Sequence, residues 1–529
     1  MSAQWKNAAR TPNLSRLQRQ AYHSFGEGHL EKTERLCAGI LEYRPDDFDA
    51  LQLLGVLNLQ RLRPVEALRF LVKALKINSG SADAMSNIGL ALHATGRFEE
   101  AVAHFRNALL LAPGHPEILY NLGNAHLELG LIDEALADYD EVLAKNPDHV
   151  GALVNRGNTL LRFNRPVEAM ASYDKALVAM PGHQQILTNR GHALRRLDRP
   201  TQALADFEAA LVRSVEFPEA HFESAMTRLA LGDFANGWKE YEWRWKTGAF
   251  AGKRRHFKAP LWLGDTPVSG KTILLHAEQG LGDTLQFIRY APLLAGHGAK
   301  VVCEVQSELR ALLSHFDGID VVAEGEPLPA FDLHCPLLSL PLAFGTRIET
   351  IPASVPYLAV PAERLAYWRD RLPHGPRAGF VWSGSATHKN DLNRSIPLAR
   401  LAALFGNPAL RCFSLQSELR DADKEALDGL PNLVHLGGEL RDFADTAAVI
   451  SLLDIVVSVD TSVAHLAGAL GKPVVILLPF AADFRWMRHR DDTPWYPTAK
   501  LIRQQAFGDW DSAILRLGDE LGAIARRGM

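Results

Sequence analysis

Residues 454–478 read DIVVSVDTSVAHLAGALGKPVVILL, and no other stretch of the chain says as much about its fold. The apolar run at 455–459 is typical of a buried parallel strand. A polar turn follows, then a helix of small residues at 463–470 that ends at Gly471, and then a second apolar run at 474–478. We therefore expect a strand–turn–helix–strand unit whose polar groups lie at the carboxyl end of the first strand, where open α/β sheets bind ligands.

The polar turn holds Asp460, Thr461 and Ser462, and His465 lies one helical turn further along. A helix amino terminus offers free N–H groups and a partial positive charge to an anion such as a phosphate. The alternative is that Asp460 and Thr461 only cap the helix and that His465 is buried. Because several polar groups converge at the end of one strand, the stretch favours an enzyme or a nucleotide-binding protein.

Length and composition set the remaining limits. The chain has 529 residues, of which 47% are hydrophobic and 22% charged, so we expect two or three globular domains. Its net charge of −4 gives no sign of a nucleic-acid partner. We see no secretory signal at the amino terminus and no apolar stretch long enough to cross a bilayer. Four scattered cysteines without metal-ligand spacing predict reduced thiols, no bound metal and a cytoplasmic protein: Cys37, Cys303, Cys335 and Cys412.

The first half of the chain repeats every 34 residues. Small and aromatic residues recur at this step: Gly55, Gly89, Gly123, Gly157 and Gly191; Ala67, Ala101, Ala135, Ala169 and Ala203; Phe105, Tyr139, Tyr173 and Phe207. The pattern resembles the tetratricopeptide repeat, a helix–turn–helix unit. The small residues let paired helices approach closely, and we expect the aromatic residue to fill the next interface. Residues 14–47 and 218–251 match less well, as end caps of a solenoid do, so we predict an all-α superhelix over residues 1–251.

Four repeats carry asparagine at their sixth position: Asn87, Asn121, Asn155 and Asn189. In tetratricopeptide superhelices the first helices line the concave face, so these side chains would form a ladder there. An amide both donates and accepts, and can bind an extended polypeptide backbone whatever its sequence. The ladder resembles that of the protein O-GlcNAc transferases, which hold polypeptide acceptors. The equally open alternative is that these asparagines bond only to neighbouring helices.

From about Lys271 the pattern changes to alternating strands and helices. A proline-rich linker at 352–376 separates two blocks of expected strands, at 272–277, 300–305, 319–323 and 331–334, and at 378–382, 409–415, 433–436, 455–459 and 474–478. Two such blocks predict two Rossmann-like lobes facing a cleft, one over residues 252–375 and one over 376–529.

Two motifs relate residues 270–529 to a known family. They are Gly-Leu-Gly-Asp-Thr-Leu at 280–285 and Asp-Thr-Ser-Val-Ala-His at 460–465. On these motifs the second half resembles glycosyltransferases of the GT-B fold, close to glycosyltransferase family 9, the lipopolysaccharide heptosyltransferases. The whole layout resembles bacterial proteins with tetratricopeptide repeats fused to such a domain. The resemblance implies inverting transfer of a hexosyl or heptosyl group from a nucleotide sugar, with no separate cofactor and no catalytic metal.

An inverting transferase needs a carboxylate to take the proton of the acceptor hydroxyl. The resemblance gives this role to Asp283, and Gly280 and Gly282 beside it would let the backbone approach the substrate. The alternative is a helix cap, since Asp is favoured there, and a helix amino terminus would weaken the carboxylate as a base.

The resemblance also implies a donor site. Asp460 and Thr461 would contact the sugar and diphosphate, and His465 would lie near the nucleotide. Ser462 stands where the heptosyltransferases usually have glycine, and their chains lack the repeats, so the donor sugar and the acceptor are left open.

The loop at 382–397 follows the first strand of the second block and is small, polar and basic. Arg394 takes the place of a phosphate-binding lysine of the heptosyltransferases, and arginine can hold a phosphate through two hydrogen bonds. Lys389 is a second candidate, for which a solvated loop is an equally good explanation.

A second loop, at 484–497, is basic and aromatic. Its tryptophans, Trp486 and Trp495, could stack on a base or sugar, and its arginines could face phosphate: Arg485, Arg488 and Arg490. A packed interface between lobes explains this composition equally well.

We therefore predict a glycosyltransferase that moves a sugar from a nucleotide-sugar donor to a hydroxyl, with the repeats recruiting a polypeptide acceptor or partner. Two alternatives stay open. One is a repeat scaffold whose transferase-like half has lost activity. The other is a transferase that acts on lipopolysaccharide or another glycan.

Overall fold

The computed structural model describes residues 13–316, 318–388 and 390–527. The chain divides into two compact units. The first contains residues up to 161 together with 171–181, and the second contains 162–170 together with the chain from 182 onward. The predicted domain limits at 251/252 and 375/376 stay predictions.

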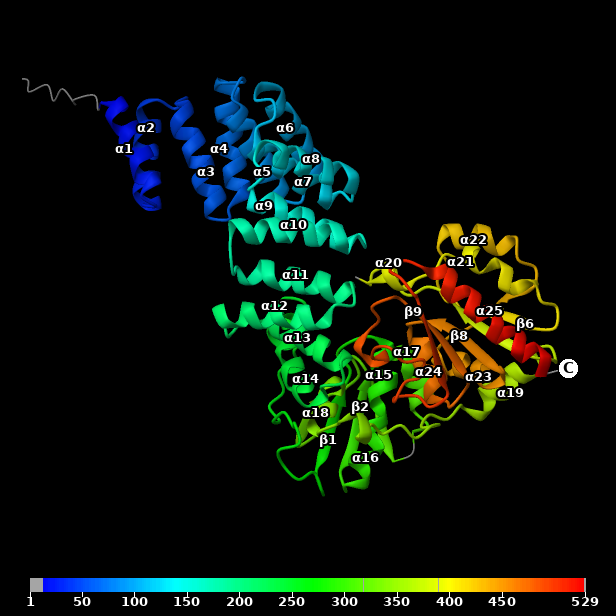
Figure 1. The fold of residues 1–529 in the computed structure, drawn as a ribbon. Helices are drawn as coiled ribbons and strands as arrows, with labels where there is room; N and C mark the ends of the chain where they lie inside the picture. The colour runs from blue at the N-terminus through cyan, green and yellow to red at the C-terminus, as the bar shows by residue number, and fades with distance from the viewer. Residues whose placement is uncertain (1–12, 317, 389, 528–529) are drawn as a thin grey trace, which may run out of the picture. The chain divides into compact units, whose positions relative to one another are not determined.

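The first unit is built from helix pairs (Figure 1), and successive pairs begin 34 residues apart, as the repeat period predicts. Consecutive pairs are in contact, α2 with α3, α4 with α5 and α6 with α7. The boundary between the units passes through α10. The helices are α1 (Leu14–Gly26), α2 (Leu30–Tyr43), α3 (Phe48–Gln60), α4 (Pro64–Ile77), α5 (Ala82–Ala94), α6 (Phe98–Leu111), α7 (Pro116–Glu128), α8 (Ile132–Lys145), α9 (Val150–Arg162) and α10 (Pro166–Ala179).

The recurring glycine and aromatic residue pack against each other within each repeat. A Cβ atom on Gly89 would lie 2.6 Å from the ring of Phe105, which is fully buried, so only glycine fits there. Phe105 also shares a buried apolar cluster with Ile118 and Leu122 of the next repeat. The ring therefore packs first against its own repeat and contributes to the next interface as well, which extends the sequence prediction.

The second unit opens with two further helix pairs, made by α11 (Gln184–Arg196), α12 (Pro200–Arg213), α13 (Pro218–Ala230) and α14 (Phe234–Tyr241). The end of this array shares its core with the α/β region that follows. The Trp238 ring meets those of Phe287 and Phe484 edge to face, with centroids 6.2 and 5.7 Å apart. Arg244, fully buried in the 3₁₀ turn after α14, forms an ion pair with Glu278 at 3.1 Å. The last repeats and the α/β region are thus one packed body.

The first sheet of the α/β region is parallel, with strand order β3-β2-β1-β4. Its strands are β1 (Thr272–His276), β2 (Lys300–Val305), β3 (Ile319–Ala323) and β4 (Leu333–Pro336), within or close to the predicted ranges. The helices are short: α15 (Leu281–Phe287), α16 (Ala291–Gly296), α17 (Ser307–Leu313) and α18 (Leu340–Ala343).

The second sheet is also parallel, with strand order β10-β9-β8-β5-β6-β7. Its strands are β5 (Arg377–Val381), β6 (Arg411–Ser414), β7 (Leu433–His435), β8 (Ile455–Val459), β9 (Val474–Leu478) and β10 (Ala499–Arg503). Five were predicted and β10, an edge strand, was missed. The helices are α20 (Asp391–Arg394), α21 (Leu398–Leu401), α22 (Asp421–Asp428), α23 (Phe443–Leu452), α24 (Ser462–Ala469) and α25 (Trp510–Arg527).

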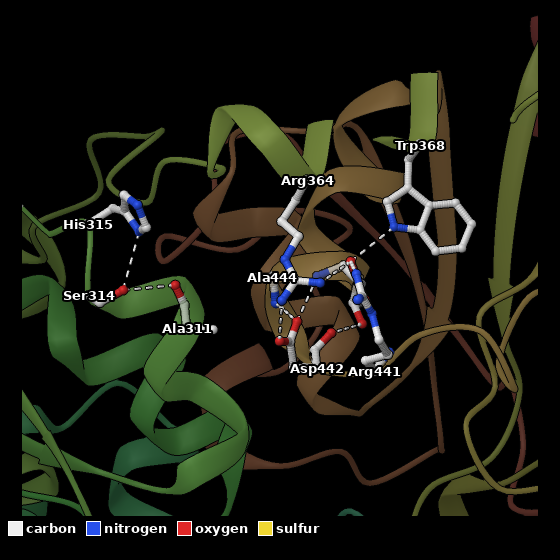
Figure 2. Close-up of polar contacts among 10 residues, drawn as sticks. Ala311, Ser314, His315, Arg364, Trp368, Arg441, Asp442 and Ala444 are labelled. Atoms are coloured by element: carbon white, nitrogen blue, oxygen red, sulfur yellow. Dashed lines mark hydrogen bonds and ion pairs between the residues drawn. The ribbon is translucent and has the colours of Figure 1, made fainter. Parts of the chain in front are cut away.

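The predicted linker at 352–376 contains a helix, α19 (Ala362–Arg369), which packs on α23. Figure 2 shows Arg364, Trp368 and Arg441 converging on the amino end of α23. Their common acceptor is the fully buried carboxylate of Asp445, which Arg364 reaches at 2.9 Å and Trp368 Nε1 at 3.2 Å. Burial alone would raise the pKa of Asp445, but the hydrogen bonds from Arg441 and Trp368 outweigh it and hold the pKa below its ordinary value. The linker is therefore fastened to the second sheet region by a charged cluster.

None of the helices in the described part of the chain is both long and apolar enough to cross a bilayer.

Candidate active site

Both sheets reverse their strand order beside a predicted site motif. In the second sheet the reversal lies between β5 and β8, and in the first it lies between β1 and β4. Ligands of open α/β sheets bind at such switch points, beyond the carboxyl ends of the strands. Residues 460–462 follow β8, residues 382–397 follow β5 and residues 280–283 follow β1. The fold therefore places all three predicted segments at switch points.

The helices that follow β1 and β8 pack against each other, which joins the two motifs. α15 is in contact with α24. A Cβ atom on Gly282 would lie 2.8 Å from Cδ2 of His465 and 3.4 Å from Cα of Ser462. Glycine at position 282 is thus required by this close approach. Segments 280–285 and 460–465, distant in sequence, therefore lie against each other.

Asp283 lies in the first turn of α15 and is held through both carboxylate oxygens. Its Oδ2 accepts a hydrogen bond of 2.8 Å from the backbone N–H of Gly280, and its Oδ1 accepts one from the Arg485 guanidinium. The side chain is 18% exposed, so a substrate can reach it. Burial raises the pKa of Asp283 above its ordinary value although Arg485 opposes this. The capping and base interpretations are therefore compatible.

Arg485 follows β9 and is largely buried, with 10% of its side chain exposed. Besides Asp283, it donates to Gln286 Oε1 at 2.8 Å and to Asp483 Oδ1 at 2.7 Å. The sequence offered Arg485 only as one of several cations that could face phosphate. Its contact with Asp283 was not predicted.

Arg394 lies beside Asp460 at the switch point of the second sheet. Its Nη1 donates to the backbone carbonyl of Asp460 at 2.8 Å, and a Cβ atom on Gly384 would lie 2.4 Å from its Nη2. Among the described residues no carboxylate forms an ion pair with Arg394, and its buried Nε has no hydrogen-bond partner there. The guanidinium thus retains charge and hydrogen-bonding capacity for an anionic ligand.

Asp460 is a carboxylate in an unfavourable environment. Burial and, to a smaller extent, the charge of Asp483 raise its pKa, Arg394 and Arg485 oppose the shift, and the net result is a pKa of about 6. A group with such a perturbed pKa, beside a guanidinium that forms no ion pair among the described residues, is typical of a functional site.

The remaining residues of this motif have mixed surroundings. Thr461 precedes α24, but its hydroxyl bonds to Ser458 Oγ at 2.9 Å rather than capping the helix. Ser462 is the first residue of α24 and is partly exposed. His465 is buried, bonds through Nδ1 to Tyr496 Oη at 2.9 Å and stacks on Trp486, with ring centroids 5.2 Å apart.

Burial holds the pKa of His465 well below its ordinary value, and the neighbouring arginines add to this effect, so the imidazole is neutral at pH 7. Its Nε2 lies 4.0 Å from Oδ1 of Asp460. The buried interpretation of this histidine is therefore correct, and contact with a nucleotide stays a prediction.

The loop after β5 is held by a residue that the sequence did not single out. Gln416, at the carboxyl end of β6, accepts from the backbone N–H groups of Trp382 and Ser383 at 3.3 and 3.2 Å. Its amide donates back to the Ser383 carbonyl at 3.1 Å. The rule that polar residues at strand ends build sites could have identified it. Lys389 lies outside the described residues.

The aromatic loop at 484–497 forms a packed interface, which decides between the two interpretations left open. Trp486 and Trp495 are fully buried and are not available to stack on a base. Arg488 bonds to Asp198, in the turn between α11 and α12, and Arg490 bonds to Asp492.

The four repeat asparagines are partly exposed. Asn155 donates to Tyr120 Oη at 3.0 Å and to Asn124 Oδ1 at 2.8 Å, both on the preceding first helix, as the structural alternative predicted. Asn189 accepts from Gln185 at 2.9 Å. Within the described chain Asn87 and Asn121 make no hydrogen bond through their side chains.

A pocket of about 420 Å³ opens at the carboxyl edge of the first sheet. Its lining comes from the ends of β1, β2 and β3 and from the segment after the repeats: Ala277, Glu278, Gln279, Glu304, Gln306, Glu324, Gly325, Lys253 and Arg255. Burial raises the pKa of Glu278 to about 7 although Arg244 opposes this. Residues 277–279 of the pocket lining precede Asp283 by four to six positions in the sequence. Within 13–316, 318–388 and 390–527, no three His, Cys, Asp or Glu side chains are grouped as metal ligands.

Comparison with known families matches the two halves separately. Tetratricopeptide repeat families match residues 80–147, 120–183 and 188–241. Glycosyltransferase family 9 (heptosyltransferase) matches residues 412–501. This range includes the 460–465 motif and excludes Arg394 and the 280–285 motif.

Among curated proteins, the chain is 25% identical to Protein FlbA of Caulobacter vibrioides over 333 residues. The alignment covers 58% of this chain and 55% of FlbA, so the chain spans about half the length of the relative it matches.

Solved structures of repeat proteins resemble part of the chain. A tetratricopeptide repeat protein from Parabacteroides merdae is 19% identical at a TM-score of 0.38, covering 44% of this chain and 93% of its own. PilF of Pseudomonas aeruginosa is 20% identical at a TM-score of 0.36, and the similarity covers 39% of this chain and 94% of PilF. YrrB, a repeat protein with an unusual peptide-binding site, is 21% identical at a TM-score of 0.30, and the similarity covers 35% of this chain and 95% of YrrB. With TM-scores below 0.5, these similarities say nothing about the function of this chain. The chain carries tetratricopeptide repeats and, towards its carboxyl end, a glycosyltransferase family 9 domain.

Proposed function

We propose that this protein is an inverting, metal-independent glycosyltransferase whose two sheets are the two lobes of a GT-B fold. The observation that carries the proposal is the packing of Gly282 against His465 and Ser462. This packing supports a single site that contains Asp283, Asp460 and Arg394. The family match at 412–501 supports a nucleotide-sugar donor.

The site residues divide into donor and acceptor groups. Arg394, which forms no ion pair among the described residues, would bind the diphosphate and would stabilise the leaving nucleoside diphosphate. Asp460 and Thr461, with Ser462 beside them, would bind the donor sugar. Positive charge from Arg394 takes the place that a metal ion would otherwise fill.

Asp283 would be the general base. The acceptor oxygen attacks the anomeric carbon of the sugar while its proton passes to the Asp283 carboxylate. The bond from that carbon to the diphosphate oxygen breaks, and the nucleoside diphosphate leaves with the electron pair. The raised pKa of Asp283 brings its basicity closer to neutral pH, which suits this role.

The acceptor would be a hydroxyl on a polypeptide recruited by the repeats, in the cytoplasm. Partly exposed amides at Asn87 and Asn121, without partners in the described chain, support binding of an extended backbone. Asn155 and Asn189 already have partners and would contribute less.

A transfer experiment tests the proposal. The purified protein is incubated with radiolabelled UDP-, GDP-, ADP- and dTDP-sugars and a cell lysate in the presence of EDTA, and label is followed in proteins and in glycolipids. We expect label from one donor on protein. Asp283→Asn should reduce transfer by at least about a hundredfold.

The same experiment separates the alternatives. Label in glycolipid would favour a glycan-directed transferase, and the absence of label with every donor would favour a non-catalytic scaffold. Changing the four asparagines to Ala should reduce protein labelling and leave hydrolysis of the donor by water unchanged, which separates recruitment from chemistry.

A further inference from the structure

The Asp283–Arg485 ion pair joins two parts of the molecule that are 202 residues apart in sequence. Asp283 belongs to α15 of the first sheet region, and Arg485 belongs to the loop after β9 of the second. Arg485 also bonds to Gln286, which is buried near the end of the same short helix. The buried guanidinium of Arg485 therefore forms hydrogen bonds with two residues of α15.

The loop that carries Arg485 is fastened on both sides. Arg488 bonds to the carboxylate and the carbonyl of Asp198, at 2.5 and 3.1 Å, in the turn between α11 and α12. Arg503, at the end of β10, donates to the carbonyls of Trp486 and Arg490. Asp483 accepts from both the backbone and the side chain of Arg485. The guanidinium is thus held in place by the last repeats and by the sheet edge before any substrate binds.

These contacts fix the orientation of the Asp283 carboxylate. Gly280 N–H binds one of its oxygens and Arg485 binds the other, and each oxygen retains a lone pair for a further hydrogen bond. A carboxylate that can rotate must be oriented in each turnover, whereas this one is preorganised.

We propose that Arg485 is a positioning residue, which holds the carboxylate of Asp283 ionised and oriented to receive the proton of the acceptor hydroxyl. This inference rests on the proposed function, because it assigns Asp283 the role of base. It adds that the repeats contribute to catalysis through the Asp198–Arg488 contact, which anchors the same loop.

The charged surroundings of Asp283 determine what removal of Arg485 would do. Several groups face it from the packed elements: Tyr241 of α14, Glu278 after β1, Arg394 after β5, and Asp483 and Arg485 after β9. The two carboxylates favour a proton on Asp283, and the two guanidiniums oppose it. Without Arg485 the carboxylates prevail, and Asp283 should bind its proton more tightly.

The test measures Asp283 directly in the full-length protein. Aspartate labelled with ¹³C at Cγ is titrated by NMR, and the Asp283 signal is assigned by its loss in Asp283→Asn. Arg485→Gln should raise the pKa of Asp283 by about one unit or more, and the acidic limb of the kcat/KM profile for sugar transfer should move up equally. Arg485→Lys keeps the positive charge, so the acidic limb of its kcat/KM profile should stay near that of the wild type. Its kcat should fall, because lysine does not hold the carboxylate in the same orientation.

Two controls distinguish this role from a purely structural one. Arg488→Gln breaks the anchor to Asp198 but leaves the charges beside Asp283 in place, so it should lower kcat and change the pKa of Asp283 much less than Arg485→Gln does. Asp483→Asn removes an opposing charge and should lower the pKa of Asp283, which keeps the inference testable if Arg485→Gln does not fold. An unchanged pKa in both Arg485→Gln and Asp483→Asn, or faster transfer by Arg485→Gln at pH 7, would overturn it. Absence of transfer by the wild type would instead refute the proposed function, whereas the NMR titration would still report on the ion pair.

Discussion

At the scale of single residues, the molecule keeps charged groups where burial disfavours them. Asp283 and Asp460 both have raised pKa values because they are removed from water. Neighbouring arginines, Arg394 and Arg485, offset only part of this penalty. Natural proteins retain such unfavourable groups mainly where function requires them.

Asp460→Asn should therefore stabilise the protein at high pH. The folded-state pKa, raised to about 6, lies above the unfolded value of about 3.9, so ionised Asp460 destabilises the fold above pH 6. Replacement by the neutral amide should raise the free energy of unfolding by about 3 kcal/mol at pH 8, and the gain should disappear as the pH falls below about 4. Urea unfolding from pH 4 to 8 measures this.

The matched control for this measurement is Asp428→Asn, an exposed carboxylate at the end of α22, which should show no such pH dependence. A gain that is equal at pH 4 and pH 8 would show that the carboxylate of Asp460 does not carry the effect.

Sequence reasoning at this scale found the groups but not their partners. Asp283, Arg394 and Asp460 were singled out because each follows a strand, and the fold brings their segments together. The pairing of Asp283 with Arg485 could not be predicted, since it depends on how two sheets pack across a separation of 202 residues.

At the scale of elements, the contact between α15 and α24 holds the site together. Its tightest point is Gly282 against His465, whose ring cannot move aside because Tyr496 binds its Nδ1 and Trp486 stacks on its face. The repeat pattern predicted why glycine recurs in the helical array. The same reasoning applies to Gly282, but its partner could not be named from the sequence.

Gly282→Ala should push the two helices apart. Alanine is normally favoured over glycine inside a helix, but its Cβ would lie 2.8 Å from the His465 ring, so the variant should lose about 1–3 kcal/mol of stability. Gly280→Ala is the matched control, because its Cβ would meet only Asp283 Oδ2 at 3.3 Å and its φ of −75° suits any residue. Equal unfolding midpoints for the two variants in urea would contradict this packing argument.

At the scale of the whole molecule, the repeat spacing predicted the helix pairs and the apolar runs predicted most of the strands. The 34-residue step predicted the starts of the helix pairs, and buried parallel strands appear in sequence as continuous apolar runs. β10 was missed because Lys500 and Arg503 interrupt its sequence, so residues 499–503 do not form a continuous apolar run. Strand order, and with it the two switch points, follows from tertiary packing and could not be obtained from the runs alone.

The most direct measurement is the melting temperature of the full-length protein with each nucleoside diphosphate and nucleotide sugar in turn. We predict that the ligands of one base stabilise the wild type, by about 2.7 kcal/mol at a hundred times the dissociation constant. Asp283→Asn should keep this stabilisation, because its carboxylate acts on the acceptor. Arg394→Gln should lose most of it, because its guanidinium holds the diphosphate. A wild-type protein whose melting temperature no nucleotide or nucleotide sugar changes would contradict the assignment of a donor site between β5 and β8.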